Sequence, residues 1–177
     1  YVTSYYKERY GFSMTYNQLQ SLKDCKYRMV IKSKLFNGNL SYGEVVIKPT
    51  EMEHNIDRGG VNGFYKNEIL FSTYICHPSM ANNECSGPAL ISELINYVQS
   101  IKNRRYTYRF LFIPETIGSI VYLSKNINHL KNNLKAGFVV SCVGDDKCYS
   151  MITSRYGNSF SDKVLKNILD FHCAYKT

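Results

Sequence analysis

The first third of the chain alternates weakly between apolar and polar residues. Two short alternating runs, at 26–35 and 42–49, flank a turn signal at Asn37-Gly38, and this arrangement predicts a β-hairpin. A short polar helix or turn is expected at 16–24, and the polar, glycine-containing stretch 50–67 is expected to form a loop. The pattern therefore predicts a small, hairpin-containing N-terminal part.

From residue 68 onward, nearly continuous apolar runs alternate with amphipathic segments. Strands are predicted at 68–75, 106–114 and 135–144, with a short fourth strand at 148–154. Helical spacing is found at 88–102, 118–125, 127–133 and 159–175. Buried strands separated by helices are typical of a parallel sheet covered on both faces. We predict an α/β fold with a mostly parallel sheet flanked by helices, divided into residues 1–67 (small hairpin part) and 68–177 (core).

Composition narrows the class of protein. A chain of 177 residues that is 44% hydrophobic can form one domain with an insertion, and it has no apolar run long enough to span a membrane. The net charge of +8 is dispersed. Its one basic cluster, at 102–105, follows a predicted helix, where cations complement the dipole, so nucleic-acid binding is not favoured. The six cysteines form no C-x-x-C pair, which predicts reduced thiols and a cytoplasmic location.

Three successive predicted strands end on groups that bind metals or transfer protons. His77 follows the first strand with Glu84 close behind, Glu115 follows the second, and Asp145 follows the third. The carboxyl ends of parallel strands meet at one edge of a sheet, where open α/β proteins bind ligands. Imidazole and carboxylate groups suit a catalytic zinc ion, and a nearby carboxylate can act as a general base. The alternative is that each acid caps a helix, as Glu115 would just before 118–125.

Four segments in this region resemble a bacterial aminopeptidase-like family of poorly defined function, whose members occur in gene sets for surface polysaccharide synthesis. The segments are ICHPSMANNECSGPALISEL, YRFLFIPETIGSIVYLSKN, GFVVSCVGDD and SRYGNSFSDK. The resemblance covers roughly residues 1–177. It implies the fold of the di-zinc aminopeptidases with a small inserted β domain, and one or two zinc ions as cofactor.

The resemblance also implies roles for individual residues. His77 matches the first zinc-binding histidine, and Glu115 matches the carboxylate that activates water. Asn83 stands where the family places an aspartate that bridges two metals, and the adjacent Glu84 is a carboxylate that can substitute for it. Thr116 replaces a glutamate ligand.

The third strand end and the C-terminus depart further from the family. Asp145 is the candidate for a later aspartate ligand, although a direct overlay places Ser141 at that position. A last histidine ligand, which the family carries further downstream, has no counterpart. We therefore expect the core to be incomplete at its C-terminus, with open sheet edges that favour association into homo-oligomers.

Two functional hypotheses follow from these observations. The leading one is a zinc-dependent aminopeptidase-like hydrolase of a small peptide or amide substrate, with Arg155 and Tyr156 binding a substrate carboxylate or carbonyl. The alternative is a catalytically inactive or weak module that binds a glycan or nucleotide-sugar intermediate of surface polysaccharide synthesis. A cysteine hydrolase that uses Cys76 or Cys85 with His77 is not favoured, because residues 76 and 77 of one strand would point to opposite faces.

Overall fold

The computed structural model describes residues 7–8, 11–12, 14–50, 67–77, 80–172 and 175–176. The chain divides into two compact units, residues 1–38 and 39–177. The first contains the short helix α1 (Tyr16–Ser21), which confirms the helix expected at 16–24. Most of the predicted loop at 50–67 lies outside the described residues.

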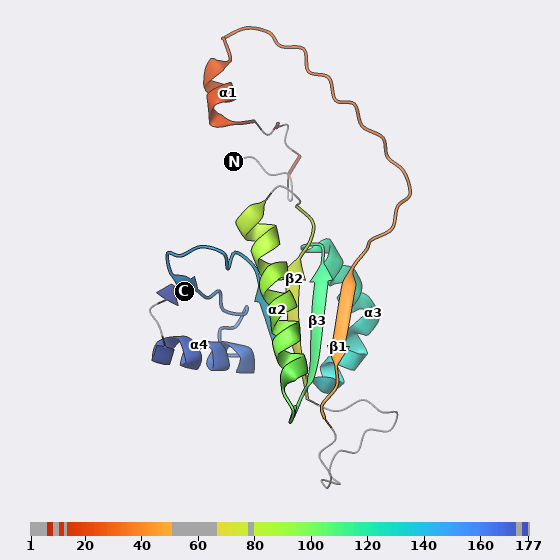
Figure 1. Cartoon of the computed structure of the whole chain (residues 1–177). Helices are drawn as coiled ribbons and strands as arrows, with labels where there is room; N and C mark the ends of the chain where they lie inside the picture. The colour runs from red at the N-terminus through yellow and green to blue at the C-terminus, as the bar shows by residue number, and fades with distance from the viewer. Residues whose placement is uncertain are drawn as a thin grey trace. The chain divides into compact units, whose positions relative to one another are not determined.

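A four-stranded sheet forms the centre of the second unit (Figure 1). Its strands are β1 (Gly43–Ile47), β2 (Glu68–Tyr74), β3 (Thr107–Ile113) and β4 (Leu134–Val140), in the order β1-β3-β2-β4. Strand β2 pairs in parallel with both β3 and β4, whereas β1 runs antiparallel to β3. The mostly parallel sheet is therefore confirmed.

The structure corrects the expected hairpin. The described residues 26–35 form no strand, and β1 pairs with β3 instead, with Val45 opposite Phe110. The reason lies in burial. Ile47 packs into a core cluster with Ile91 and Phe110, and this removal of apolar surface from water is not available in an isolated two-stranded hairpin.

Helices cover both faces of the sheet (Figure 1). Helix α2 (Ser86–Ser100) packs its apolar side on the cluster around Phe110. Helix α3 (Ile117–Asn133) covers the opposite cluster, which contains Leu111, Tyr122 and Leu130. It is one continuous helix, not the two pieces expected at 118–125 and 127–133, because apolar side chains continue to face the sheet through Leu130.

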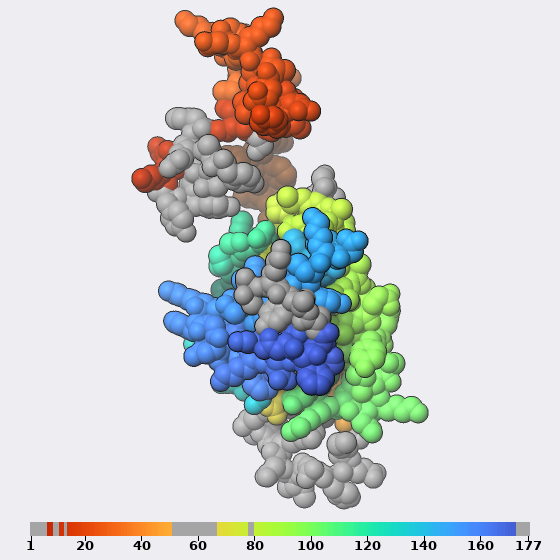
Figure 2. All heavy atoms as spheres, turned by 90° about the vertical axis from the view of Figure 1, so that its left-hand side faces the viewer, coloured from red at the N-terminus to blue at the C-terminus, as the bar shows by residue number. Residues whose placement is uncertain are grey.

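The C-terminal part adds a third helix, α4 (Phe160–His172), on the side of the unit shown in Figure 2 (dark blue). The fourth strand expected at 148–154 is short: β5 (Tyr149–Ser150) pairs with β6 (Tyr175–Lys176) in a separate two-stranded sheet. Among the described residues, no helix is both long and apolar enough to cross a membrane.

A buried charged cluster links the sheet to α3. Arg109 on β3 donates hydrogen bonds to both carboxylate oxygens of Glu68 on β2 and to Glu44 on β1. The hydroxyl of Tyr122 on α3 donates to Glu44 at 2.6 Å, and His129 lies 3.1 Å from Glu68. Burial raises the pKa of Glu68, but the hydrogen bonds and charges of Arg109 and His129 outweigh it and hold that pKa below its usual range.

We expect Arg109→Met to lower the free energy of unfolding by about 3–5 kcal/mol, because it leaves the carboxylate of Glu68 buried without its cation. Glu68 is only 2% exposed. The measurement is urea unfolding followed by circular dichroism. The control is Arg105→Met, an exposed position two residues before β3, where we expect a change within about 0.5 kcal/mol. Equal effects at both positions would contradict this role for the buried cluster.

Candidate functional site

The candidate site lies at the carboxyl end of β2. The strand ends at Tyr74, and Cys76 and His77 follow in an irregular segment. A five-residue π-helical turn, η1 (Ala81–Cys85), then carries Glu84 and leads directly into α2. Single π-helical turns of this kind are frequent at functional sites.

Gly87 allows the start of α2 to pack closely on the sheet. A Cβ atom at this position would overlap Oγ1 of Thr73 and would lie 2.5 Å from the carbonyl oxygen of Val140. Any side chain would push the helix away from β2 and β4. The close approach at Gly87 therefore helps to fix the position of η1, and with it Glu84, above the strand ends.

The carboxylate of Glu84 contacts both Cys76 and His77. Its side chain is 3% exposed, whereas that of His77 is 51% exposed. One carboxylate oxygen lies 2.7 Å from Nδ1 of His77, and the other accepts the backbone N–H of Cys76 at 2.8 Å. The thiol of Cys76 lies 3.4 Å from Nδ1 of His77 and 3.6 Å from Oε1 of Glu84. Imidazole, thiol and carboxylate thus meet at one point.

The expectation that Cys76 and His77 point to opposite faces is wrong. Strict alternation holds only inside a strand, and β2 ends at Tyr74 before either residue. Beyond that point the chain bends, which brings Sγ of Cys76 within 3.4 Å of the imidazole.

Glu115 reaches the same place from β3. Its backbone N–H donates to Sγ of Cys76 at 3.1 Å. The next residue, Thr116, has φ 59° and ψ −70°, and the N–H of Ile117 bonds to the carbonyl of Glu115 at 2.6 Å. This is the rare, strained form of the γ-turn. Strained backbone of this kind clusters at functional sites, and here it ends the extended segment after β3 and starts α3 directly behind Glu115.

The four side chains form a group that fits a metal ion. The ligand atoms of Cys76, His77, Glu84 and Glu115 all lie within 4.8 Å of one another. Their nitrogen, oxygen and sulfur atoms are the donors that zinc accepts. Glu84 is buried and Glu115 is exposed, so the group is anchored on one side and accessible on the other.

Asn83 and Asp145 are not in this group. The side-chain amide of Asn83 donates to Sγ of Cys142 at 3.5 Å, and the backbone carbonyl of Asn83 accepts from the hydroxyl of Ser141 at 3.1 Å. The carboxylate of Asp145 accepts from the side chain of Asn82 at 3.3 Å and from the backbone of Lys147 at 3.0 Å. Both side chains therefore connect η1 to the loop after β4.

Asn82 and Ser86 also contact the loop after β4, and sequence analysis did not predict these contacts. Oδ1 of Asn82 accepts the N–H of Gly144 at 2.7 Å, and Oγ of Ser86 accepts the N–H of Val143 at 3.0 Å. A Cβ atom on Gly144 would lie 2.8 Å from that of Ser86. The only sequence signal was an Asn-rich loop before a Ser-Gly helix start.

Arg155 and Tyr156 lie on an exposed turn between β5 and α4. The guanidinium of Arg155 lies 5.8 Å from the centre of the Tyr156 ring, which is 82% exposed. Asp162 anchors this turn, since its carboxylate accepts hydrogen bonds from Ser154 and Ser159. These bonds hold the pKa of Asp162 well below its usual range.

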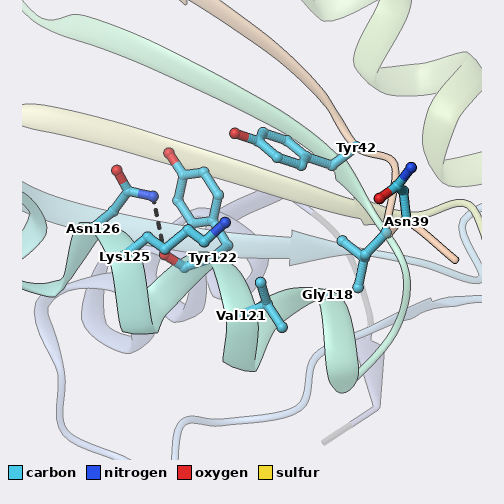
Figure 3. Close-up of a pocket in the computed structure, with 8 residues that line it drawn as sticks. Asn39, Tyr42, Gly118, Val121, Tyr122, Lys125 and Asn126 are labelled. Carbon is cyan, nitrogen blue, oxygen red and sulfur yellow. Dashed lines mark hydrogen bonds between the residues drawn. The ribbon is translucent and has the colours of Figure 1, made fainter. Parts of the chain in front are cut away.

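A separate pocket lies on α3 and the segment before β1 (Figure 3). Its eight lining residues include Tyr42, Tyr122, Lys125 and Asn126, but none of the four residues of the metal-binding group. The carbonyl of Tyr122 accepts the side-chain amide of Asn126 at 3.0 Å there.

Comparison with known proteins places the chain in a family. Residues 13–176 match a family model described as "Domain of unknown function (DUF4910)". The chain belongs to the DUF4910 family. This DUF4910 chain is 43% identical over 173 residues to a Clostridium acetobutylicum protein named "Putative polysaccharide biosynthesis protein with aminopeptidase-like domain", covering 98% of this chain and 36% of that protein.

The chain also matches a solved structure. The crystal structure of a protein described as a "putative peptidase", also from Clostridium acetobutylicum, is 41% identical, with a TM-score of 0.72 over 99% of this chain and 38% of that one. The DUF4910 chain thus spans little more than a third of the length of these relatives. Their names agree with the aminopeptidase-like resemblance found in the sequence.

The buried carboxylate of this DUF4910 chain predicts a pH-dependent contribution to stability. Burial raises the pKa of Glu84, but hydrogen bonds from His77 and from the backbone of Cys76 outweigh it, so the pKa lies below its ordinary value of 4.5. A carboxyl whose pKa is lowered by folding stabilises the fold above its unfolded pKa, and this contribution is lost as the pH falls through the folded pKa.

We therefore expect Glu84→Gln to lower the unfolding free energy of metal-free protein by about 1–3 kcal/mol near pH 7. The difference in unfolding free energy between the variant and wild type should shrink below about pH 4.5, where the carboxyl of Glu84 becomes protonated. Urea unfolding in a chelator at several pH values measures it, with the exposed Glu93→Gln as the control. A difference that does not change between pH 7 and pH 3 would show that the charge of Glu84 has no such role.

Proposed function

We propose that this chain carries the zinc site of an aminopeptidase-like hydrolase that cleaves a peptide or amide bond. The observation that carries the proposal is the gathering of an imidazole and two carboxylates, from the ends of β2 and β3 and from η1, within 4.8 Å. In this proposal His77 and Glu84 hold the metal and Glu115 acts as general base. The names of the two relatives support the reaction class at the level of the family.

The different burial of Glu84 and Glu115 suits them to different roles. Glu84 is enclosed and bonded to the backbone of Cys76, which suits a fixed ligand. Glu115 is exposed, which suits a group that must meet substrate and water. A zinc ion in such a site supplies Lewis acidity and lowers the pKa of bound water. Glu115 accepts the proton of the attacking water and returns it to the leaving amine.

The remaining candidates support a single ion over two. Asn83 is a neutral amide that bonds to Cys142, and Asp145 bonds to Asn82, so both would have to leave these contacts to bind a second metal. We retain Arg155 and Tyr156 as proposed contacts for a substrate carboxylate or carbonyl, because their exposed turn leaves both side chains accessible.

One observation favours a second candidate function. Asn83 and Thr116 stand where the aminopeptidases of the resembled family carry acidic metal ligands. In addition, the name of the 43% identical Clostridium acetobutylicum protein refers to polysaccharide biosynthesis. A module that binds a glycan or nucleotide sugar without cleaving it would tolerate both replacements. Such a module need not bind zinc at His77.

The decisive prediction concerns His77. We expect purified protein to bind about one zinc ion per chain, and His77→Ala to lower zinc affinity at least about 100-fold, since a lost ligand costs no less than a lost outer-shell partner. Isothermal titration calorimetry measures it. The matched control is His172→Ala, on the exposed end of α4, which should bind zinc as wild type does. Equal zinc binding by His77→Ala and wild type would refute the proposed site.

A second prediction tests the chemistry. With zinc bound, Glu115→Gln should lower the rate of hydrolysis of aminoacyl amides by about 10²–10⁴-fold while zinc affinity changes little, because a general base typically contributes that factor. The measurement is release of a chromogenic amine at saturating substrate. Hydrolysis that is unchanged in Glu115→Gln would remove Glu115 from the mechanism. Zinc binding without any hydrolysis, together with saturable binding of a nucleotide sugar, would favour the second function.

A further inference from the structure

We propose that Cys76 binds the same metal ion through its sulfur, so that the site is a mixed nitrogen, oxygen and sulfur site. This inference rests on the proposed function, because it takes a metal ion held by His77 and Glu84 as its starting point. It adds a ligand that the aminopeptidase resemblance does not supply. The argument comes from the distances, the charges and the surroundings of the thiol.

The distances around the sulfur match those within a metal site. Zinc–sulfur bonds are about 2.3 Å long and zinc–nitrogen or zinc–oxygen bonds about 2.0–2.1 Å, so on a tetrahedral ion the sulfur lies about 3.5 Å from each lighter ligand. Sγ of Cys76 is 3.4 Å from Nδ1 of His77 and 3.6 Å from Oε1 of Glu84. Both sulfur distances already have the spacing of two ligands on one ion.

The third edge of this triangle is shorter. Nδ1 of His77 and Oε1 of Glu84 are 2.7 Å apart, which is a hydrogen bond and not a ligand spacing, so these two atoms must separate by roughly half an ångström to share a tetrahedral ion. The exposed His77 side chain can make this adjustment, whereas Glu84 is fixed by its burial and by the backbone of Cys76. Metal binding therefore requires only a small rotation of the imidazole.

Charge also favours a cation beside the sulfur. The carboxylates of Glu84 and Glu115 have oxygen atoms within 4.8 Å of each other and of the sulfur of Cys76. A divalent ion balances the repulsion between the carboxylates, and the thiolate is the form of cysteine that binds metals. On binding, the sulfur gives its proton to solvent and forms the metal–sulfur bond. The backbone N–H of Glu115, 3.1 Å away, already donates to the sulfur.

Two of the other described cysteines provide controls. Cys85 and Cys148 are free and exposed, and neither belongs to the group of four. Cys85 is especially well matched, because it follows Glu84 directly on η1. Soft thiolate donors favour zinc and cadmium over magnesium or manganese, so Cys76 would also set the metal preference of the site.

The test replaces zinc with cobalt(II), which absorbs in the near ultraviolet when sulfur is bound to it. We expect metal-free protein titrated with cobalt to show this sulfur-to-metal band. Cys76→Ser should lose the band and bind cobalt at least about tenfold more weakly, because one ligand is weakened. Cys85→Ser and Cys148→Ser should keep both the band and the affinity.

The outcomes separate this inference from the proposed function. If cobalt binds to wild type without a sulfur band, and His77→Ala abolishes this binding, the role of Cys76 is overturned and the proposed function stands. No cobalt binding by wild type overturns both.

A measurement on wild-type protein alone guards against misfolding of Cys76→Ser. We expect saturating zinc to slow alkylation of Cys76 by iodoacetamide at least about tenfold, as followed by peptide mass spectrometry, while Cys148 reacts at an unchanged rate. The factor follows from occupation of the thiolate by the metal. Rapid alkylation of Cys76 that zinc does not affect would overturn the inference and indicate a free nucleophilic thiol.

Discussion

The parallel pairing of β2 between β3 and β4 is the constraint on which the rest of the structure depends. Tyr74 lies opposite Ile113, and Thr73 opposite Val140, so the chain leaves all three strands at the same edge of the sheet. The segments that follow must therefore meet there. The buried cluster of Arg109 and Glu68 holds β2 and β3 together, while the packing of α2 on the sheet at Gly87 sets the height of η1 above this edge.

Within that frame, the buried carboxylate of Glu84 determines how the site is arranged. A charge that is removed from water must be compensated by hydrogen bonds or by an opposite charge, and Glu84 obtains its partners from Cys76 and His77. This requirement bends the chain after β2 and draws the thiol and the imidazole together. The same anionic, enclosed group is well suited to hold a divalent ion, which links the local fold to the proposed chemistry.

The sequence allowed the core strands and helices to be predicted, because β2, β3 and β4 are mostly apolar runs and α2 has a clear apolar face. The partner of β1 was not predictable from turn signals, since burial of Ile47 against Phe110 outweighs a local hairpin. The contact between Cys76 and His77 was missed because alternation was extended to residue 77, although β2 ends at Tyr74. The contact of Asn82 with Gly144 was not predicted because this hydrogen bond joins residues 62 positions apart.

The central claim is that the residues at this sheet edge bind one zinc ion. X-ray absorption at the zinc edge of zinc-loaded protein tests it most directly, because the spectrum reports the ligands themselves. The account predicts imidazole and oxygen ligands at about 2.0–2.1 Å and one sulfur at about 2.3 Å. A spectrum with neither imidazole nor sulfur, as for zinc that is bound only by water and surface carboxylates, would contradict it.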